Sequence, residues 1–118
     1  MASILVIGPH PDDQELGMGG TVALLASQGH KVVLVDMTTG EPTPLGSPEV
    51  RAKEAAAAAK ILGVERTGVG LINRQVTHDL ESRYKLAAVI RRQLMIGDTA
   101  SIEGCHDLHH VVPAEAGP

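Results

Sequence analysis

Residues 8–21, GPHPDDQELGMGGT, carry an unusual density of side chains that can bind a metal or move a proton. His10 offers an imidazole nitrogen and Asp13 a carboxylate oxygen, and both groups are suitable zinc ligands. Asp12 is adjacent to Asp13 but points elsewhere, so it can stay free as a general base. The prolines on either side of the histidine limit its backbone freedom. The stretch therefore favours metal chemistry.

Two simpler interpretations of this stretch stay open. Asp12 and Asp13 are helix-capping residue types, and His10 is an ordinary turn residue. The glycines of GMGG suggest phosphate binding, but the G-x-G-x-x-G fingerprint is incomplete here. We favour a metal because His10, both aspartates and Glu15 fall within six residues.

A catalytic metal site also needs a third protein ligand. His30 closes a predicted helix and His78 lies near the start of another, so neither is a strong candidate. In the group HDLHH, His106 and His109 are three residues apart, and one helical turn can present both to the same point. His110 is the nearest competitor. The alternative is a solvated tail without a metal ligand.

The elements that must position these residues alternate along the chain. Apolar runs predict strands at 3–8, 31–37 and, less regularly, 69–72. Helical patterns predict helices at 15–28, 48–62 and 78–94. Ser47 is the expected N-cap of the second helix, and Gly63 ends it. This order predicts a Rossmann-like α/β fold with a mostly parallel sheet of three to four strands and flanking helices.

After Met95 neither the helical nor the strand period is clear. We therefore divide the chain into a Rossmann-like core at 1–95, which carries the metal loop, and a divergent tail at 96–118. The tail holds the possible His-x-x-His element and ends in residues typical of a frayed terminus.

Composition narrows the classes of function. The chain has 118 residues, which fits one domain, and a core of aliphatic side chains, since it holds one Tyr and no Phe or Trp. A net charge of −4 without a basic cluster argues against a nucleic-acid partner. Cys105 is the single cysteine, which excludes an internal disulfide and fits a reducing compartment.

The sequence also predicts no membrane partner. No apolar run approaches the roughly 20 residues of a membrane span, and the N-terminal residues are not those of a signal peptide. We expect a soluble, cytoplasmic protein.

PHPDDQELGMGGT resembles the (A/P)-H-P-D-D-x-E-x-G-x-G-G-T signature of the LmbE/PIG-L family, zinc-dependent de-N-acetylases of N-acetylglucosamine conjugates. The stretch TTGEPTPLGSPEVRAKEAAAAAKILG resembles the T-x-G-E loop and R-x-x-E helix of that family. The likeness covers about residues 3–95. It implies a Zn²⁺ cofactor with His10 and Asp13 as ligands, Asp12 as the base that activates water, and Arg51 on the substrate side.

The later H-P-D-H motif of the family has a counterpart in HDLH. By this resemblance His109 is the third zinc ligand, and His106 is a catalytic residue that stabilises the oxyanion. Asp107 and Leu108 depart from the motif. The apolar strand expected before the motif is replaced by LMIGDTASIEGC, and the residues that the family places after the motif are missing.

These features together predict a zinc-dependent hydrolase that removes the acetyl group from a small-molecule amino-sugar conjugate of the N-acetylglucosamine type. The alternative is a catalytically impaired metal-binding or structural α/β module. A short parallel sheet leaves an unpaired edge and apolar faces that are incompletely covered, so we also expect a homo-oligomer.

Overall fold

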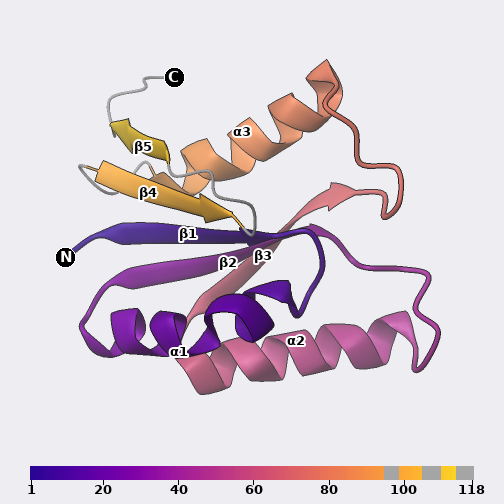
Figure 1. Cartoon of the computed structure of the whole chain (residues 1–118), viewed down its shortest axis with the longest axis horizontal. Helices are drawn as coiled ribbons and strands as arrows, with labels where there is room; N and C mark the ends of the chain where they lie inside the picture. Colours follow the sequence, from indigo (N-terminus) through magenta and orange to yellow (C-terminus); the bar gives the residue numbers. More distant parts are fainter. Residues whose placement is uncertain (95–98, 105–109, 114–118) are drawn as a thin grey trace.

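The computed structural model describes residues 1–94, 99–104 and 110–113 (Figure 1). The helices are α1 (Asp13–Ser27), α2 (Pro48–Leu62) and α3 (Leu80–Leu94). The strands are β1 (Ser3–Gly8), β2 (Lys31–Thr38), β3 (Glu65–Leu71), β4 (Thr99–Gly104) and β5 (His110–Pro113). The predicted alternation of strands and helices is therefore confirmed.

The strands form one sheet in the order β3-β2-β1-β4-β5. The first four run parallel, and β5 pairs antiparallel with β4. The Rossmann-like, mostly parallel α/β fold is confirmed, although the sheet is wider than the sequence patterns indicated. The additional strands lie in the stretch for which we assigned no element, and β4 corrects the expectation that a strand is missing there. The division of the chain at residue 95 stays a prediction.

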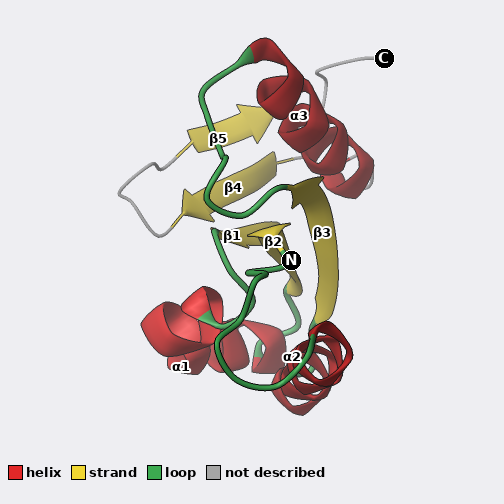
Figure 2. Ribbon diagram, turned by 90° about the vertical axis from the view of Figure 1, so that its right-hand side faces the viewer, coloured by secondary structure: helices red, strands yellow, loops and turns green. Residues whose placement is uncertain are grey.

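Both faces of the central strands are buried, as their continuous apolar runs predicted. One face holds a cluster of Leu5, Val33, Val35 and Val89. The other face holds a cluster of Val6, Val22, Val32 and Leu34. Figure 2 shows α1 and α2 together on one side of the sheet and α3 on the other. The core is therefore two aliphatic layers on either side of β1 and β2.

Local signals explain most helix boundaries. The bounds of α2 are those predicted: Ser47 Oγ accepts a hydrogen bond from Val50 N at 3.2 Å, and Gly63 ends the helix at φ 74°. Helix α1 begins two residues before the predicted start, at Asp13. Helix α3 begins two residues later than predicted because Asp79 caps it, accepting a hydrogen bond from Ser82 N at 2.7 Å.

The strand order places the opening loop at a topological switch point. The chain leaves β1 toward β2 on one side, and β4 later pairs on the other side. In open α/β sheets, ligands bind at the carboxyl ends of the strands where the order reverses in this way. The residues that follow Gly8, at the end of β1, lie at such a point.

Within the described ranges, no helix has the length and apolar character that a membrane span needs.

Candidate metal and substrate site

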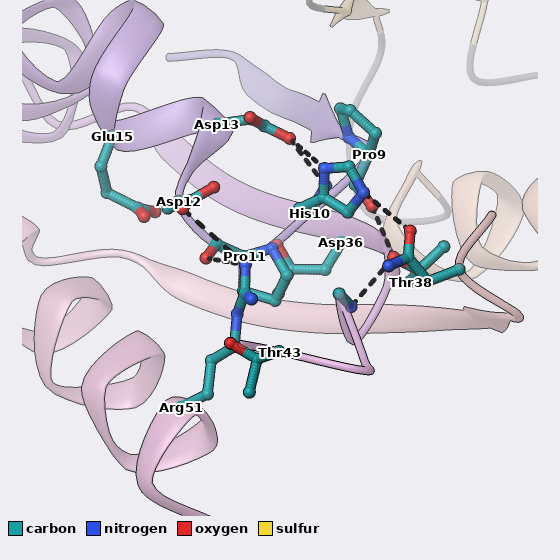
Figure 3. A network of polar contacts seen from close by, with 12 residues as sticks. Pro9, His10, Pro11, Asp12, Asp13, Glu15, Asp36, Thr38, Thr43 and Arg51 are labelled. Atoms are coloured by element: carbon teal, nitrogen blue, oxygen red, sulfur yellow. Dashed lines mark hydrogen bonds and ion pairs between the residues drawn. The ribbon is translucent and has the colours of Figure 1, made fainter. Parts of the chain in front are cut away.

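The two predicted metal ligands from the opening loop lie against each other (Figure 3). His10 N donates to Asp13 Oδ2 at 2.8 Å, and His10 Nδ1 lies 3.2 Å from the same oxygen. The two side chains are 40% and 30% exposed, so the pair is open to a solute. The tight turn between β1 and the first residue of α1 therefore brings both donors to one point.

The other ring nitrogen of His10 contacts a residue that the sequence analysis missed. His10 Nε2 lies 2.8 Å from Asn73 Oδ1, across 63 positions of the sequence. Asn73 lies in the loop after β3, at the carboxyl edge of the sheet where β1 also ends. Its place just beyond a strand end is the signal that can identify it, but the predicted end of β3 was itself inexact.

Asp12 occupies the N-cap position of α1, yet among the described residues its side chain makes no capping hydrogen bond. The carboxylate is 55% exposed, and its Oδ2 lies 3.7 Å from Arg51 Nη2. Its φ of 155° is rare for a residue with a side chain. Asp12 thus has the position of a capping residue, but its side chain is turned toward Arg51 and does not cap the helix.

Arg51 reaches the opening loop from the first turns of α2. Its Nη2 lies 3.5 Å from Pro11 O, in addition to the contact with Asp12. The guanidinium lies against Gly40, where a Cβ atom would be only 2.8 Å from Arg51 Cζ. Gly40 also has a φ of 76°, which favours glycine. The T-x-G-E loop therefore leaves room for the arginine that the resemblance places on the substrate side.

Thr38 joins the two loops that carry these residues. Its Oγ1 and its backbone N donate to Pro9 O at 2.9 and 3.1 Å. Gly40 N in turn donates to Thr38 Oγ1 at 3.0 Å. Because Thr38 is buried, these hydrogen bonds hold the loop after β2 against the loop after β1.

A buried ionic network joins β3, β2 and α1 next to the site. Arg66 donates to both carboxylate oxygens of Asp36, at 2.7 and 2.9 Å, and to Glu15 Oε1 at 2.8 Å. Gln14 is 1% exposed and donates to Asp36 Oδ1 at 2.9 Å. Burial lowers the pKa of Arg66, but hydrogen bonds with Asp36 and Glu15 outweigh it and hold that pKa above its ordinary value. Arg66 was not among the residues predicted from the sequence, because the predicted strand began at residue 69, beyond it.

A cavity of about 560 Å³ opens beside Asp12 and Arg51. It lies between α2 and the loop before it, and Glu15 and Glu54 add carboxylates to its wall. A second cavity of about 380 Å³ shares Pro11 and Arg51 with the first. Arg51 thus borders both spaces in which a substrate can lie next to the opening loop.

The structure brings together four of the predicted site residues: His10, Asp12, Asp13 and Arg51. The other two, His106 and His109, lie outside the described residues. In the described part of the chain, no cluster of three or more His, Cys, Asp or Glu side chains is arranged to hold a metal ion. The described site therefore supplies two converging donors.

Residues 5–116 match the model of the PIG-L family, described as GlcNAc-PI de-N-acetylase. The chain belongs to this family. The resemblance of the first motif to LmbE/PIG-L proteins is thereby confirmed, and the PIG-L family is one of enzymes.

Curated PIG-L relatives are named as deacetylases. The uncharacterized deacetylase YaiS of Escherichia coli K12 is 47% identical over 64 residues, which are 54% of this chain and 34% of YaiS. The diacetylchitobiose deacetylase of Thermococcus kodakarensis is 31% identical over 98 residues, 76% of this chain and 37% of that enzyme. The chain thus spans only about a third of the length of these two relatives.

Solved structures share the fold. The conserved protein TT1542 of Thermus thermophilus has a TM-score of 0.73 and 43% identity over 78% of this chain and 42% of TT1542. The N,N'-diacetylchitobiose deacetylase of Pyrococcus horikoshii has a TM-score of 0.69 and 30% identity, over 83% of this chain and 39% of the enzyme. GalB, a 4-carboxy-2-hydroxymuconate hydratase from Pseudomonas putida, has a TM-score of 0.68 and 28% identity, over 85% and 46%. The fold is therefore that of a PIG-L deacetylase, although one similar structure is a hydratase.

Proposed function

We propose that this chain holds a zinc ion through His10 and Asp13 and hydrolyses the acetamido group of an N-acetylglucosamine-type conjugate. The contact between these two side chains is the observation that carries the proposal. Family membership and the names of the relatives support the class of reaction. We further propose a cytoplasmic location and a small amino-sugar conjugate as substrate.

The donor set fits a metal ion. Both ring nitrogens of His10 face oxygen atoms, since Nδ1 is 3.2 Å from Asp13 Oδ2 and Nε2 is 2.8 Å from Asn73 Oδ1. A neutral imidazole has a single N–H, so one of these contacts brings two lone pairs together, and either a second proton on the ring or a metal ion between the two atoms relieves this. Nitrogen and oxygen ligands about 2.0–2.2 Å from a tetrahedral zinc ion lie roughly 3.3–3.5 Å apart. The gap between Nδ1 and Oδ2 is close to that spacing.

Asp12 and Arg51 are the described residues that then act in the reaction. A bound zinc ion supplies Lewis acidity at the acetyl carbonyl and lowers the pKa of a water toward about 7. Asp12 accepts a proton from the attacking water and returns it to the amine as the amide C–N bond breaks, leaving acetate and a free amine. General base catalysis of this kind contributes about 10²–10⁴-fold. Arg51, beside the cavity, orients the sugar.

The remaining roles come from the tail. We propose His109 as the third zinc ligand and His106 as the group that stabilises the oxyanion. A metal-binding module without turnover is the alternative, and a hydratase is a second candidate because GalB shares the fold at 28% identity. The same water-activating residues can add water to an activated double bond.

Product analysis distinguishes these functions. The zinc-loaded chain is incubated with N,N'-diacetylchitobiose, and free amine and acetate are measured. Equimolar release of amine and acetate is the expected result for the deacetylase. Loss of the ultraviolet absorbance of a 2-hydroxymuconate-type diacid, without acetate release, means the hydratase. Bound zinc with neither reaction means the module.

A further inference from the structure

We propose that Asn73 is a positioning residue that holds His10 with Nδ1 toward the metal. This inference rests on the proposed zinc site. Asn73 Oδ1 lies 2.8 Å from His10 Nε2, a short hydrogen bond between side chains of two separate loops. Because a side-chain carbonyl oxygen only accepts hydrogen bonds, His10 must carry its proton on Nε2.

A second hydrogen bond determines which amide atom faces the histidine. Arg74 N donates to Asn73 Oδ1 at 3.0 Å. A backbone N–H can only donate, so the atom that it contacts is the oxygen and not the amide nitrogen. Arg74 also has a φ of 69°, so the chain turns sharply just after Asn73. The hydrogen bond from Arg74 N therefore sets the orientation of the amide before any metal binds.

The consequence for His10 is a single usable tautomer. With the proton on Nε2, the lone pair is on Nδ1, the nitrogen that lies 3.2 Å from Asp13 Oδ2. The carboxylate is itself held, because His10 N donates to the same oxygen at 2.8 Å. Asn73 therefore prevents rotation of the ring, while the backbone of His10 prevents rotation of the carboxylate. Metal-binding histidines commonly need such a partner, whose loss costs about 10–100-fold in metal affinity.

The test measures Zn²⁺ affinity of the full chain by competition with a chelator. Asn73→Ala removes the acceptor and is expected to weaken Zn²⁺ binding about 10–100-fold. Asn73→Asp keeps an oxygen acceptor at the same place and is expected to stay within a few-fold of the parent. Gln75→Ala is the matched control, since Gln75 is an exposed residue of the same loop, and no change is expected.

A spectroscopic readout separates positioning from a general loss of structure. In ¹⁵N NMR spectra of the zinc-loaded parent and of Asn73→Asp, His10 is expected to show a protonated Nε2 and a metal-shifted Nδ1. In Asn73→Ala the Nε2–H signal is expected to exchange with solvent and broaden. If Asn73→Ala does not fold, the parent spectrum decides: a metal-shifted Nε2 overturns the proposal.

His10→Ala distinguishes failure of this inference from failure of the zinc site. If His10→Ala binds Zn²⁺ as tightly as the parent, the zinc site itself is wrong. If His10→Ala loses zinc while Asn73→Ala keeps full affinity, the zinc site stands and the role of Asn73 is overturned. Weakening of Asn73→Asp to the level of Asn73→Ala also overturns it, because the acceptor is retained there.

Discussion

Two neighbouring aspartates face different partners because of the backbone between them. Asp13 is the first residue of α1, and its carboxylate turns back to His10. Asp12 has a φ of 155°, and its carboxylate turns to Arg51 instead. Such a conformation costs of order 1–3 kcal/mol, which the surrounding hydrogen bonds must offset. The conformation of Asp12 keeps its carboxylate away from the two donors, as the proposed role of a base requires.

Removing each carboxylate is therefore expected to have a different result. Asp12→Asn should reduce hydrolysis at least 10²-fold and leave zinc content unchanged, because it removes the base and no ligand. Asp13→Ala should reduce zinc content itself. Amine release and elemental analysis of the same preparations check both. Full activity in Asp12→Asn, or full zinc content in Asp13→Ala, contradicts the corresponding role.

Gly40 is expected to act through Arg51. Gly40→Ala places a methyl group 2.8 Å from Arg51 Cζ and should displace the guanidinium, raising KM for the sugar substrate without changing zinc affinity. Gly29→Ala is the control, because Gly29 also has a positive φ, of 87°, but has open space around its Cβ position and lines neither cavity. Both variants carry a similar backbone penalty. Equal KM values in the two variants would show that the contact with Arg51 does not matter.

At the scale of elements, boundaries that local signals determine could be predicted from the sequence. Boundaries that depend on contacts between distant residues could not. The bounds of α2 follow from Ser47 and Gly63, whose effects extend over a single turn. The start of β3 was placed at 69 instead of Glu65 because its first residues are polar. Arg66 is buried against hydrogen-bond partners on α1, β2 and α2, which are distant in the sequence. Strand β4 contains one large apolar residue, Ile102, so the pairing with β1 defines it better than any periodicity.

The site shows the same contrast between residues found from local signals and residues that depend on distant contacts. His10, Asp12 and Asp13 could be found together because one motif contains them all. The contact of Asn73 with His10 depends on where β3 ends and on the hydrogen bond from Arg74 N to the Asn73 amide, and no periodic pattern encodes either. The functions assigned to these residues remain predictions.

Arg66 is expected to be the main determinant of stability below the site. Its side chain is 9% exposed, and Arg66→Ala leaves the carboxylates of Asp36 and Glu15 without their cation. Breaking such a pair from one side costs about 3 kcal/mol of unfolding free energy. Lys85→Ala is the control: Lys85 pairs with Glu81 at 3.2 Å on the surface, and its loss should cost less than about 0.5 kcal/mol. Urea unfolding measures both, and equal losses would contradict a special role for Arg66.

The position of the His110 backbone argues against His110 as the third ligand, for which we propose His109. Strand β4 ends at Gly104, which pairs with Ile7, close to the loop that holds His10. His110 pairs with Ile102, and Ile102 pairs with Leu5, so the backbone of His110 lies back from the carboxyl edge. His109→Ala should therefore weaken zinc binding by orders of magnitude, and His110→Ala only slightly. Unchanged affinity in both variants would mean that the tail does not complete the site.

On the scale of the whole molecule, the two faces of the sheet are covered unequally. Helices α1 and α2 lie on one face, and α3 is the single described helix on the other (Figure 2). The buried residue Val89 and its neighbour Ile90 pack α3 onto the sheet. Earlier in this helix, Leu80 and Tyr84 are 54% and 66% exposed, and their spacing of four places them on one helical face. Strand β3, at one edge of the sheet, pairs on one side in the described structure.

This exposed surface leads us to expect a homo-oligomer. A second copy that covers Leu80 and Tyr84 removes apolar area from water, and the edge of β3 offers backbone groups for pairing. Light scattering at micromolar concentration should give a mass that is a multiple of 12.3 kDa. Replacing both residues by Asp should shift the chain toward the monomer, whereas Ile61→Asp, at an 85% exposed position of α2, should not. A monomeric parent contradicts association, and an oligomer that persists in the double variant moves the interface away from the start of α3.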